Sequence, residues 1–452
     1  MKPRLSDLLI FLLILSLNFS LEGQTKIEKQ WPGYRGYMSS GILDNAKLPE
    51  TFDPSTMKNI KWKIEIPGLG ISSPVIWDNY LFITTAVSKS DSAGFNPGSQ
   101  IGVVSVNDSS VHQWKVLCLD KNNGKIIWDR TAHTGIPAMK RHPKSSHANA
   151  SVATDGKYVV AFFGSEGLYC YDMKGTLLWQ KSFGILKSVF VTMKSAQWEF
   201  GSSPVLYNGV VVIQVDVLEN SFLAAYDVKT GKELWKTTRD DYPGWSTPNI
   251  YRQGGKTCIA VNGFNHIGGY DFENGKEIWK MSGGGDIPIP TPVIGDNMVY
   301  INGSHGKFSP VFAISALAKG DISLTDQTTS NEFVKWSKPR LGSYIQSLLL
   351  YRNHLYNIQW NGTVTCMDPA TGNEIYTGKL GKARSFYASP VASDGKIYIT
   401  DDQGTVYIFQ DGSEFKLLAE ISLNEPSMTA AAITEGAIYF RTQHYLIAAG
   451  NK

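Results

Sequence analysis

Residues 227–235 read DVKTGKELW, and variants of this stretch return at four other places in the chain. In each full copy an Asp stands eight residues before a Trp or Tyr, with an Asn-Gly or Thr-Gly pair between them. The Asp can bond its own turn, the Gly can take positive φ, and the aromatic residue lies on the strand that resumes. Full copies occupy residues 120–128, 271–279 and 368–376, and a shortened copy occupies residues 172–179.

A second signature marks where each repeat begins. It joins small polar residues to a proline, as in Ser72-Ser73-Pro74-Val75, and a two-residue turn with an alternating strand follows. Eight such starts can be counted along the chain. Clear copies begin at residues 72, 202, 246, 290 and 388, and weaker ones begin at residues 149, 345 and 428.

Repeats of about 40 to 55 residues with four short strands each are typical of propeller blades, which bury a core only by stacking. The sequence therefore predicts an all-β, eight-bladed β-propeller. Outer strands are expected near Trp62, Trp128, Trp179, Trp235, Trp279, Trp336, Tyr376 and Leu418. Because the last two positions depart from Trp, a seven-bladed ring is the alternative.

Closure of the ring can also be predicted. The last repeat, from Pro426 to Ala449, ends before any Trp signature, whereas Trp62 has no start before it. An N-terminal outer strand that completes the last blade would leave no free end. We therefore expect a signal peptide at residues 1–23, an N-terminal extension at residues 24–57 and the propeller at residues 58–452.

Composition and the N-terminus indicate export. Lys2 and Arg4 precede an apolar run from Leu8 to Leu17, which is typical of a secretory signal; an uncleaved anchor is the alternative. No Cys lies near the cleavage region, so a lipid anchor is not expected. Hydrophobic residues make up 42% of the 452 residues, which is a globular composition. The net charge of +3 is too small to favour binding to nucleic acid. We predict a periplasmic or secreted monomer with no membrane span after cleavage.

The chain has four cysteines: Cys118, Cys170, Cys258 and Cys366. Three of them stand two residues before an Asp of the turn signature, which places them in one register of different sheets. Packed sheets lie about 10 Å apart, whereas a disulfide needs Cα atoms within about 7 Å. Buried free thiols are therefore expected.

The repeat signatures of this chain resemble those of the PQQ-like (quinoprotein-like) β-propeller repeat family over residues 31–449. The resemblance rests on the starts at residues 72 and 202 and on the run ending at Trp235. It rests also on WPGYRG at 31–36 with Gly41, as in exported bacterial members, and on residues 162–172 and 214–216. The family includes PQQ-dependent dehydrogenases, which hold a quinone and Ca²⁺, and outer-membrane assembly scaffolds. The chain lacks the vicinal Cys pair and the CxxCH segment of such enzymes, and it is shorter.

Residues just before each start should face the central funnel. The candidate ligand-binding residues are His147, Asn149, Trp198, Glu199, Trp245, Tyr344, Gln346 and Tyr387, with Phe386 beside the last. Polar insertions at 87–112 and 317–333 should lie on one face. The charged stretches 140–144 and 239–241 are interpreted as a solvated loop and a solvated turn; contact with an anionic glycan and a charge cluster at the funnel edge are the respective alternatives.

Three functions are consistent with this pattern. The favoured one is a binding or assembly scaffold of the cell envelope, whose partner is an envelope protein or a small ligand in the funnel. A PQQ-dependent dehydrogenase is the second, with Asp216, Glu199, Asp401 or Asp402 as carboxylates. A polysaccharide-acting envelope enzyme is the third, because His142, His147, His266, His305 and His444 are available. No zinc spacing is present, so no metal site is predicted.

Overall fold

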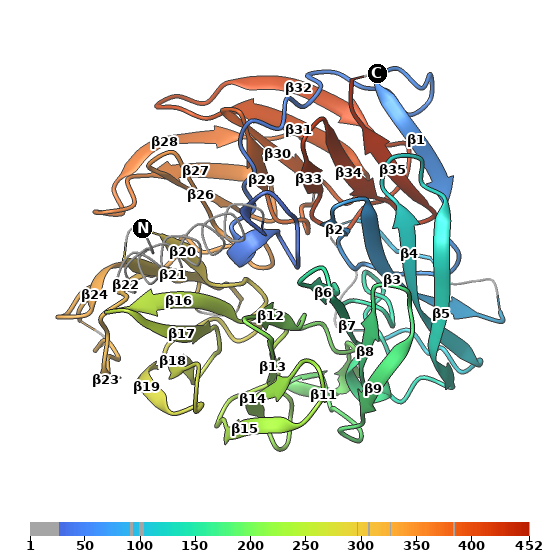
Figure 1. Ribbon diagram of the computed structural model, residues 1–452. Helices are drawn as coiled ribbons and strands as arrows, with labels where there is room; N and C mark the ends of the chain where they lie inside the picture. Colours follow the sequence, from blue (N-terminus) through green and yellow to red (C-terminus); the bar gives the residue numbers. More distant parts are fainter. Residues whose placement is uncertain are drawn as a thin grey trace, which may run out of the picture.

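The computed structural model describes residues 27–451 except 91–93, 99–103, 296, 306–307, 326 and 383–384. Within this part of the chain, eight blades form a ring, so the protein is an eight-bladed β-propeller (Figure 1). The predicted fold is confirmed, and the seven-bladed alternative is wrong. The predicted signal peptide lies outside the described residues. None of the described helices has the length and apolar character that a membrane crossing requires.

Each blade is an antiparallel sheet that runs from an inner strand to an outer strand, and we number the blades in the order of their inner strands. Blade 1 contains β2 (Val75–Trp77), β3 (Tyr80–Ser88), β4 (His112–Asp120) and β5 (Ile126–Gly135). Blade 2 contains β6 (Ala153–Thr154), β7 (Tyr158–Phe162), β8 (Leu168–Asp172) and β9 (Leu177–Lys181). Blade 3 contains β12 (Val205–Tyr207), β13 (Val210–Val215), β14 (Phe222–Asp227) and β15 (Glu233–Thr238). Blade 4 contains β16 (Asn249–Gln253), β17 (Lys256–Val261), β18 (Ile267–Asp271) and β19 (Glu277–Met281).

The second half of the ring repeats this order. Blade 5 contains β20 (Val293–Gly295), β21 (Met298–Asn302), β22 (Val311–Ser315) and β24 (Val334–Lys338). Blade 6 contains β25 (Leu349–Tyr351), β26 (His354–Ile358), β27 (Thr363–Met367) and β28 (Glu374–Lys379). Blade 7 contains β29 (Val391–Ser393), β30 (Lys396–Thr400), β31 (Thr405–Gln410) and β32 (Leu417–Ser422). Blade 8 contains β33 (Ala432–Thr434), β34 (Ala437–Arg441), β35 (Tyr445–Ala449) and β1 (Ile60–Glu65).

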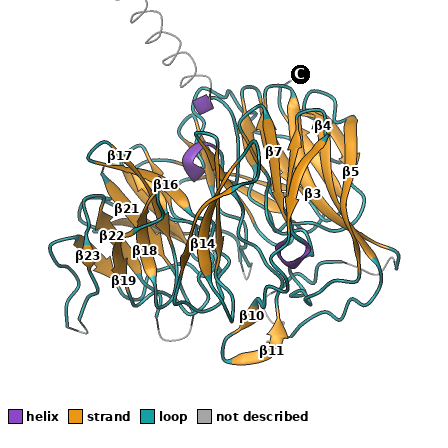
Figure 2. Ribbon diagram, turned by 60° about the horizontal axis from the view of Figure 1, so that its bottom comes forward, coloured by secondary structure: helices purple, strands orange, loops and turns teal. Residues whose placement is uncertain are grey.

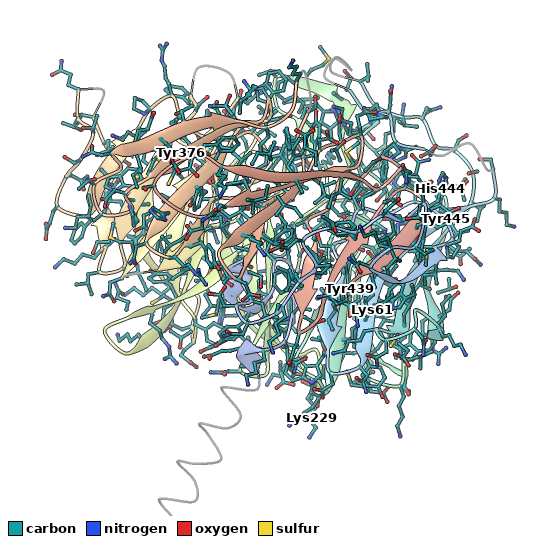
Figure 3. The ribbon with its side chains drawn as sticks, turned by 90° about the horizontal axis from the view of Figure 1, so that it is seen from above. Lys61, Lys229, Tyr376, Tyr439, His444 and Tyr445 are labelled. Atoms are coloured by element: carbon teal, nitrogen blue, oxygen red, sulfur yellow. The ribbon has the colours of Figure 1, made fainter. Side chains whose placement is uncertain are left out.

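The ring closes through the N-terminal strand, as the sequence predicts. β1 pairs antiparallel with β35, and Trp62 lies opposite Ala448. Figure 3 shows Lys61 of β1 and Tyr439 of β34 on this closing blade. The Trp62 indole then donates a hydrogen bond of 2.8 Å to the carbonyl of Lys121 in blade 1. Strand β1 therefore completes blade 8 and joins it to the first blade.

The repeated turn signature holds neighbouring blades together. The outer-strand Trp of one blade donates its indole N–H to the carbonyl that follows the signature Asp of the next blade, as Trp179 does to Val228 at 2.8 Å. The signature Gly of that turn, Gly231, has a φ of +69° and lies flat against the Trp179 ring. The same arrangement recurs at Trp62, Trp128, Trp235 and Trp336.

The seam between blades 4 and 5 is built differently. Trp279 donates to the hydroxyl of Tyr251 within its own blade rather than to blade 5. The insertion at 317–333 instead crosses back, and its strand β23 (Gly320–Asp321) pairs in parallel with β19. This insertion thus adds a fifth strand to blade 4 and covers its outer edge.

The small polar residues of the starts form a belt around the centre. The backbone amide of Ser73 donates to the hydroxyl of Ser151 at 2.9 Å. The backbone amide of Ser151 donates in turn to the hydroxyl of Ser203 at 3.0 Å. The amides of Ser203, Thr291 and Ser347 continue this pattern to the next blade. Ser and Thr recur here because each side chain satisfies a buried backbone donor of its neighbour.

The N-terminal extension crosses the middle of the ring (Figure 1). Trp31 bridges to Ile76 of blade 1, and Ile42 bridges to Ala392 of blade 7. Between them, near η1 (Tyr37–Ser39), the fully buried Arg35 donates to the carbonyls of Leu348 and Pro390. The extension therefore closes one end of the central channel.

All four cysteines are free and buried, which confirms the expected thiols. Burial raises the pKa of Cys118, Cys170 and Cys366 to about 12. These side chains pack in blade interiors, where they act as small apolar groups.

Candidate functional site

A central cavity of about 310 Å³ lies where the inner strands begin. Five of the eight predicted funnel residues line it: Asn149, Trp198, Trp245, Tyr344 and Tyr387. The other three, His147, Glu199 and Gln346, are not part of its lining and are buried. The position of the site relative to the starts could thus be predicted, but not which side chains reach the cavity.

Tyr34 of the N-terminal extension lines the closed end of the cavity, and its hydroxyl lies 3.2 Å from the Ser389 hydroxyl. The opposite face carries a hairpin of β10 (Val189–Phe190) and β11 (Met193–Gln197), which the repeat pattern did not predict. Figure 2 shows this hairpin on the side of the ring away from η1. The cavity therefore opens toward the hairpin face.

Aromatic rings form one wall of the cavity. The ring of Trp198 stacks on Phe190 at 5.0 Å and lies 5.8 Å from Trp245. Both indole N–H groups are engaged by backbone carbonyls, Trp198 to Val104 at 3.2 Å and Trp245 to Glu199 at 2.6 Å. The rings therefore have fixed positions and offer apolar faces to a ligand.

Lys144 is the cationic side chain among the described lining residues. It donates to the Tyr387 hydroxyl and to the Gly98 carbonyl, and its Nζ lies 3.6 Å from Asp402. Burial lowers the pKa of this amine. Beside it, burial and then the charges of Lys144 and Arg141 lower the pKa of His142 to about 4, so this imidazole is neutral at pH 7.

The described parts of the insertion at 87–112 contact two blades and the hairpin. The backbone amides of Phe95 and Gly98 donate to Gln443 of blade 8 and to Asp402 of blade 7. Further along, Ser105 and Gln197 of the hairpin exchange two hydrogen bonds of 2.8 Å. The two insertions differ, because the insertion at 317–333 instead pairs with the outer strand of blade 4.

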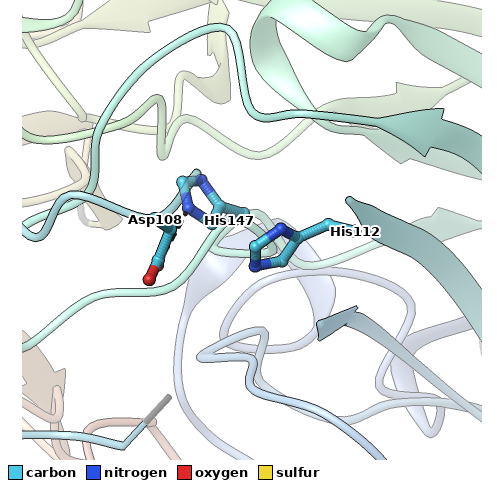
Figure 4. Close-up of side chains that lie close together, drawn as sticks. All are labelled: Asp108, His112 and His147. Carbon is cyan, nitrogen blue, oxygen red and sulfur yellow. Dashed lines mark ion pairs between the residues drawn. The ribbon is translucent and has the colours of Figure 1, made fainter. Parts of the chain in front are cut away.

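A second cluster of polar side chains lies beside the cavity (Figure 4). Glu199 lies 2.7 Å from Nδ1 of His147, and Asp108 lies 3.3 Å from Nε2 of the same ring. Burial lowers the pKa of His147, but the two carboxylates outweigh it and raise the pKa to about 9. His112 completes the cluster, since one ligand atom each from Asp108, His112 and His147 lies within 4.8 Å of the others.

Two charged stretches that the sequence suggested were solvated turns are buried in part. In the stretch 140–144, Arg141 is 2% exposed and Lys144 is 6% exposed. In the stretch 239–241, Arg239 and Asp241 are both buried, and Arg239 donates to Asp216 at 2.8 Å. The solvated interpretation is therefore wrong for these four side chains, because each gains a buried partner from a distant part of the chain.

The cavity does not have the donor set that a quinone with Ca²⁺ requires. Calcium prefers several carboxylate and carbonyl oxygens, yet the described lining residues include no Asp or Glu. The candidate carboxylates are engaged elsewhere: Glu199 with His147, Asp216 with Arg239, and Asp402 with Gly98 and Lys144. No cysteine lines the cavity either.

Comparison with known proteins places the fold in a family. A family model described as outer membrane protein assembly factor BamB matches residues 112–377, which is more than half of the chain. The chain belongs to this family of PQQ-like propellers. A search of curated proteins found no match.

Solved structures share the fold at low identity. BamB from Moraxella catarrhalis is 14% identical, with a TM-score of 0.55 over 81% of this chain and 98% of that one. Quinohemoprotein alcohol dehydrogenase from Comamonas testosteroni is 13% identical, with a TM-score of 0.62 over 94% of this chain and 81% of that one. A europium-containing methanol dehydrogenase is 10% identical, with a TM-score of 0.62 over 93% and 92%. These likenesses show the architecture, and function has to be argued from the site.

Sequence reasoning missed Tyr34, Lys144, Asp108 and His112 as site residues. Tyr34 belongs to the WPGYRG motif, whose recurrence in the family was a usable signal. Lys144 was visible only as part of a basic run. Asp108 and His112 lie in an insertion that has no repeat to compare with, so no local pattern indicated them.

Proposed function

We propose that this protein is an exported binding protein of the cell envelope that takes a small ligand in its funnel and has no reaction of its own. The observation that carries this proposal is the cavity of about 310 Å³, which one end of the chain closes and an aromatic wall lines. Such a volume is at the small end of the range for ligand pockets, about 300 to 1,000 Å³.

The chemistry of the lining indicates the ligand class. Trp198, Trp245 and Tyr344 offer ring faces, hydroxyls such as Ser145 offer hydrogen bonds, and Lys144 offers one positive charge. A small molecule with an apolar face and a hydroxyl-rich or carboxylate edge fits these groups. The predicted export signal and the BamB-type family model support a location in the envelope.

Neither enzymatic alternative gains support from this lining. A dehydrogenase of the quinoprotein type needs a carboxylate base beside the cofactor, and glycosidases use a pair of carboxylates. The described residues that line the cavity supply neither.

Ligand titration of the full mature chain tests the proposal. Aromatic carboxylates, mono- and disaccharides, and PQQ with Ca²⁺ are added while Trp fluorescence and thermal stability are followed. At least one of the first two classes should give a saturable change and a higher melting temperature. Trp245→Ala should weaken binding about tenfold or more, whereas Ile127→Ala, exposed on β5, should not. Dye-linked alcohol oxidation with PQQ and Ca²⁺ would overturn the proposal.

A protein partner is the second candidate, favoured by the hairpin β10–β11. This two-stranded ribbon forms its own sheet and extends from the face of the ring away from η1 (Figure 2). Two apolar side chains are exposed here: Met193 on the hairpin is 46% exposed, and Ile185, which precedes the hairpin, is 63% exposed. Capture of an envelope protein by the intact chain, lost in Met193→Asp with Ile185→Asp, would support a scaffold role over a small-ligand role.

A further inference from the structure

Two histidines beside the funnel are arranged as metal ligands commonly are. Nδ1 of His147 faces the Glu199 carboxylate at 2.7 Å, and Nδ1 of His112 faces the Ser110 carbonyl at 2.9 Å. Metal-binding histidines almost always donate their second ring N–H to a carboxylate or a backbone carbonyl, which fixes the tautomer and leaves the other nitrogen for the metal. Both rings here thus keep Nε2 for coordination.

The nitrogen of His147 that would bind a metal has the Asp108 carboxylate as its neighbour and makes no well-formed hydrogen bond. His147 is 3% exposed, and its Nε2 is buried without a hydrogen bond of acceptable geometry, although Oδ2 of Asp108 lies 3.3 Å away. A buried polar atom without a partner costs free energy unless something satisfies it. The distance between Nε2 of His147 and Oδ2 of Asp108 also suits a shared metal. Ligand atoms at about 2.0 to 2.1 Å from a tetrahedral Zn²⁺ lie about 3.3 Å from one another.

The third group, Asp108, supplies the oxygen ligand. Its carboxylate accepts a hydrogen bond of 2.7 Å from Nε of Arg141, and Arg141 is held by the Ser145 carbonyl at 3.0 Å. Carboxylates that bind metals are themselves usually hydrogen-bonded in this way. One nitrogen of each histidine and one carboxylate oxygen lie within 4.8 Å of one another, so the three groups converge on one point.

We propose that Asp108, His112 and His147 form a binding site for a divalent transition metal of zinc type, with a fourth position left for water or an exogenous ligand. Two imidazoles and a carboxylate suit Zn²⁺ and its neighbours in the first transition row rather than Ca²⁺ or Mg²⁺. The site does not depend on the funnel ligand proposed above.

The site would join segments that are otherwise distant. Asp108 lies in the insertion at 87–112, His112 begins β4, and His147 lies on the loop that leads to the inner strand of blade 2. A bound metal would therefore fasten the insertion to the ring beside the funnel. Glu199, next to the lining residue Trp198, would orient His147 without touching the metal.

Cobalt titration of the full chain tests the site. The protein is stripped with a chelator and titrated with Co²⁺ under visible absorbance, then with Zn²⁺ in competition and in thermal melts. One equivalent should bind, with d–d bands of a four-coordinate site that Zn²⁺ removes and with a higher melting temperature. Asp108→Asn and His112→Gln should each weaken Co²⁺ affinity at least tenfold, and Glu199→Gln should do so about tenfold.

The control is His354→Gln, because His354 also pairs with a carboxylate, Asp411 at 2.9 Å, but belongs to no such cluster among the described residues. It should leave Co²⁺ binding unchanged. Should His112→Gln not fold, Asp108→Asn and Glu199→Gln carry the test. Less than about 0.1 equivalent of bound metal without a thermal shift, or binding that these variants retain, would overturn the proposal.

Discussion

The indole N–H of Trp179 in blade 2 donates to the carbonyl of Val228 in blade 3 at 2.8 Å. Val228 follows the Asp of the repeated turn, and Gly231 of that turn lies against the Trp179 ring. The two ends of the signature therefore belong to different contacts. The Asp and Gly form a turn within their own blade, whereas the aromatic residue packs on the turn of the next blade. This relationship explains why the Asp, the Gly and the Trp recur together.

Gly231→Ala should destabilise the protein more than Gly209→Ala does. Both glycines have positive φ, +69° and +77°, which costs a non-glycine residue about 1 to 2 kcal/mol. A Cβ at Gly231 would come within 2.7 Å of Trp179, whereas nothing lies within 4 Å at Gly209. We expect Gly231→Ala to lower the free energy of unfolding by about 1 to 3 kcal/mol more than the control, in line with overpacking of a buried contact. If urea denaturation gave the same loss of unfolding free energy for Gly231→Ala and Gly209→Ala, the contact between Gly231 and Trp179 would not stabilise the seam.

Trp62→Ala should show how much the closing strand contributes. Trp62 is 6% exposed, its ring is tilted against that of Tyr439 with centroids 5.9 Å apart, and its indole donates a hydrogen bond to the carbonyl of Lys121. Truncation of a buried Trp typically costs about 3 to 5 kcal/mol. Lys61→Ala, at an exposed position on the same strand, should cost less than about 0.5 kcal/mol. If thermal melts of Trp62→Ala matched those of Lys61→Ala, β1 would not be closing the ring.

Most of the ring could be predicted from sequence because its contacts repeat. Each Trp–Gly seam leaves the same local signature, so the count of blades and the role of Trp62 follow from residues that are close in sequence. The seam between blades 4 and 5 could not be predicted, since β23 reaches back across blades without any repeat. The same holds for the site: His147 meets Asp108 and Glu199 through long-range packing, and no spacing in the chain encodes those contacts.

Arg239→Met should destabilise the protein strongly and make its stability depend on pH. Arg239 is buried with Asp216 and Asp241, and its loss leaves two buried carboxylates without their cation, at a cost of about 3 to 5 kcal/mol. Burial and the charge of Asp216 already raise the pKa of Asp241 to about 6, against the opposing effect of Arg239. Without the arginine the pKa should rise further.

The sign of that pH dependence follows from proton linkage. A folded-state pKa above the unfolded value of 3.8 means that the folded protein binds more protons between those two pH values. Stability contributed by this group is therefore greatest below pH 4 and is lost as the pH rises through 6. Urea denaturation should show a smaller difference between Arg239→Met and the unsubstituted chain at pH 5 than at pH 8. A difference independent of pH would show that the pKa of Asp241 is not raised in the folded chain.

The four cysteines should be silent toward thiol reagents until the ring opens. The thiolate is the reactive form, and burial raises the pKa of Cys118, Cys170 and Cys366 to about 12 and also raises that of Cys258. At pH 8 the native chain should therefore react with a disulfide reagent such as DTNB at none of these positions within minutes. In guanidinium all four should react, because unfolding restores both solvent access and an ordinary pKa of about 8.5. Prompt labelling of one thiol in the native protein would reveal a blade that opens locally, and Cys170→Ser or Cys366→Ser would identify which blade it is.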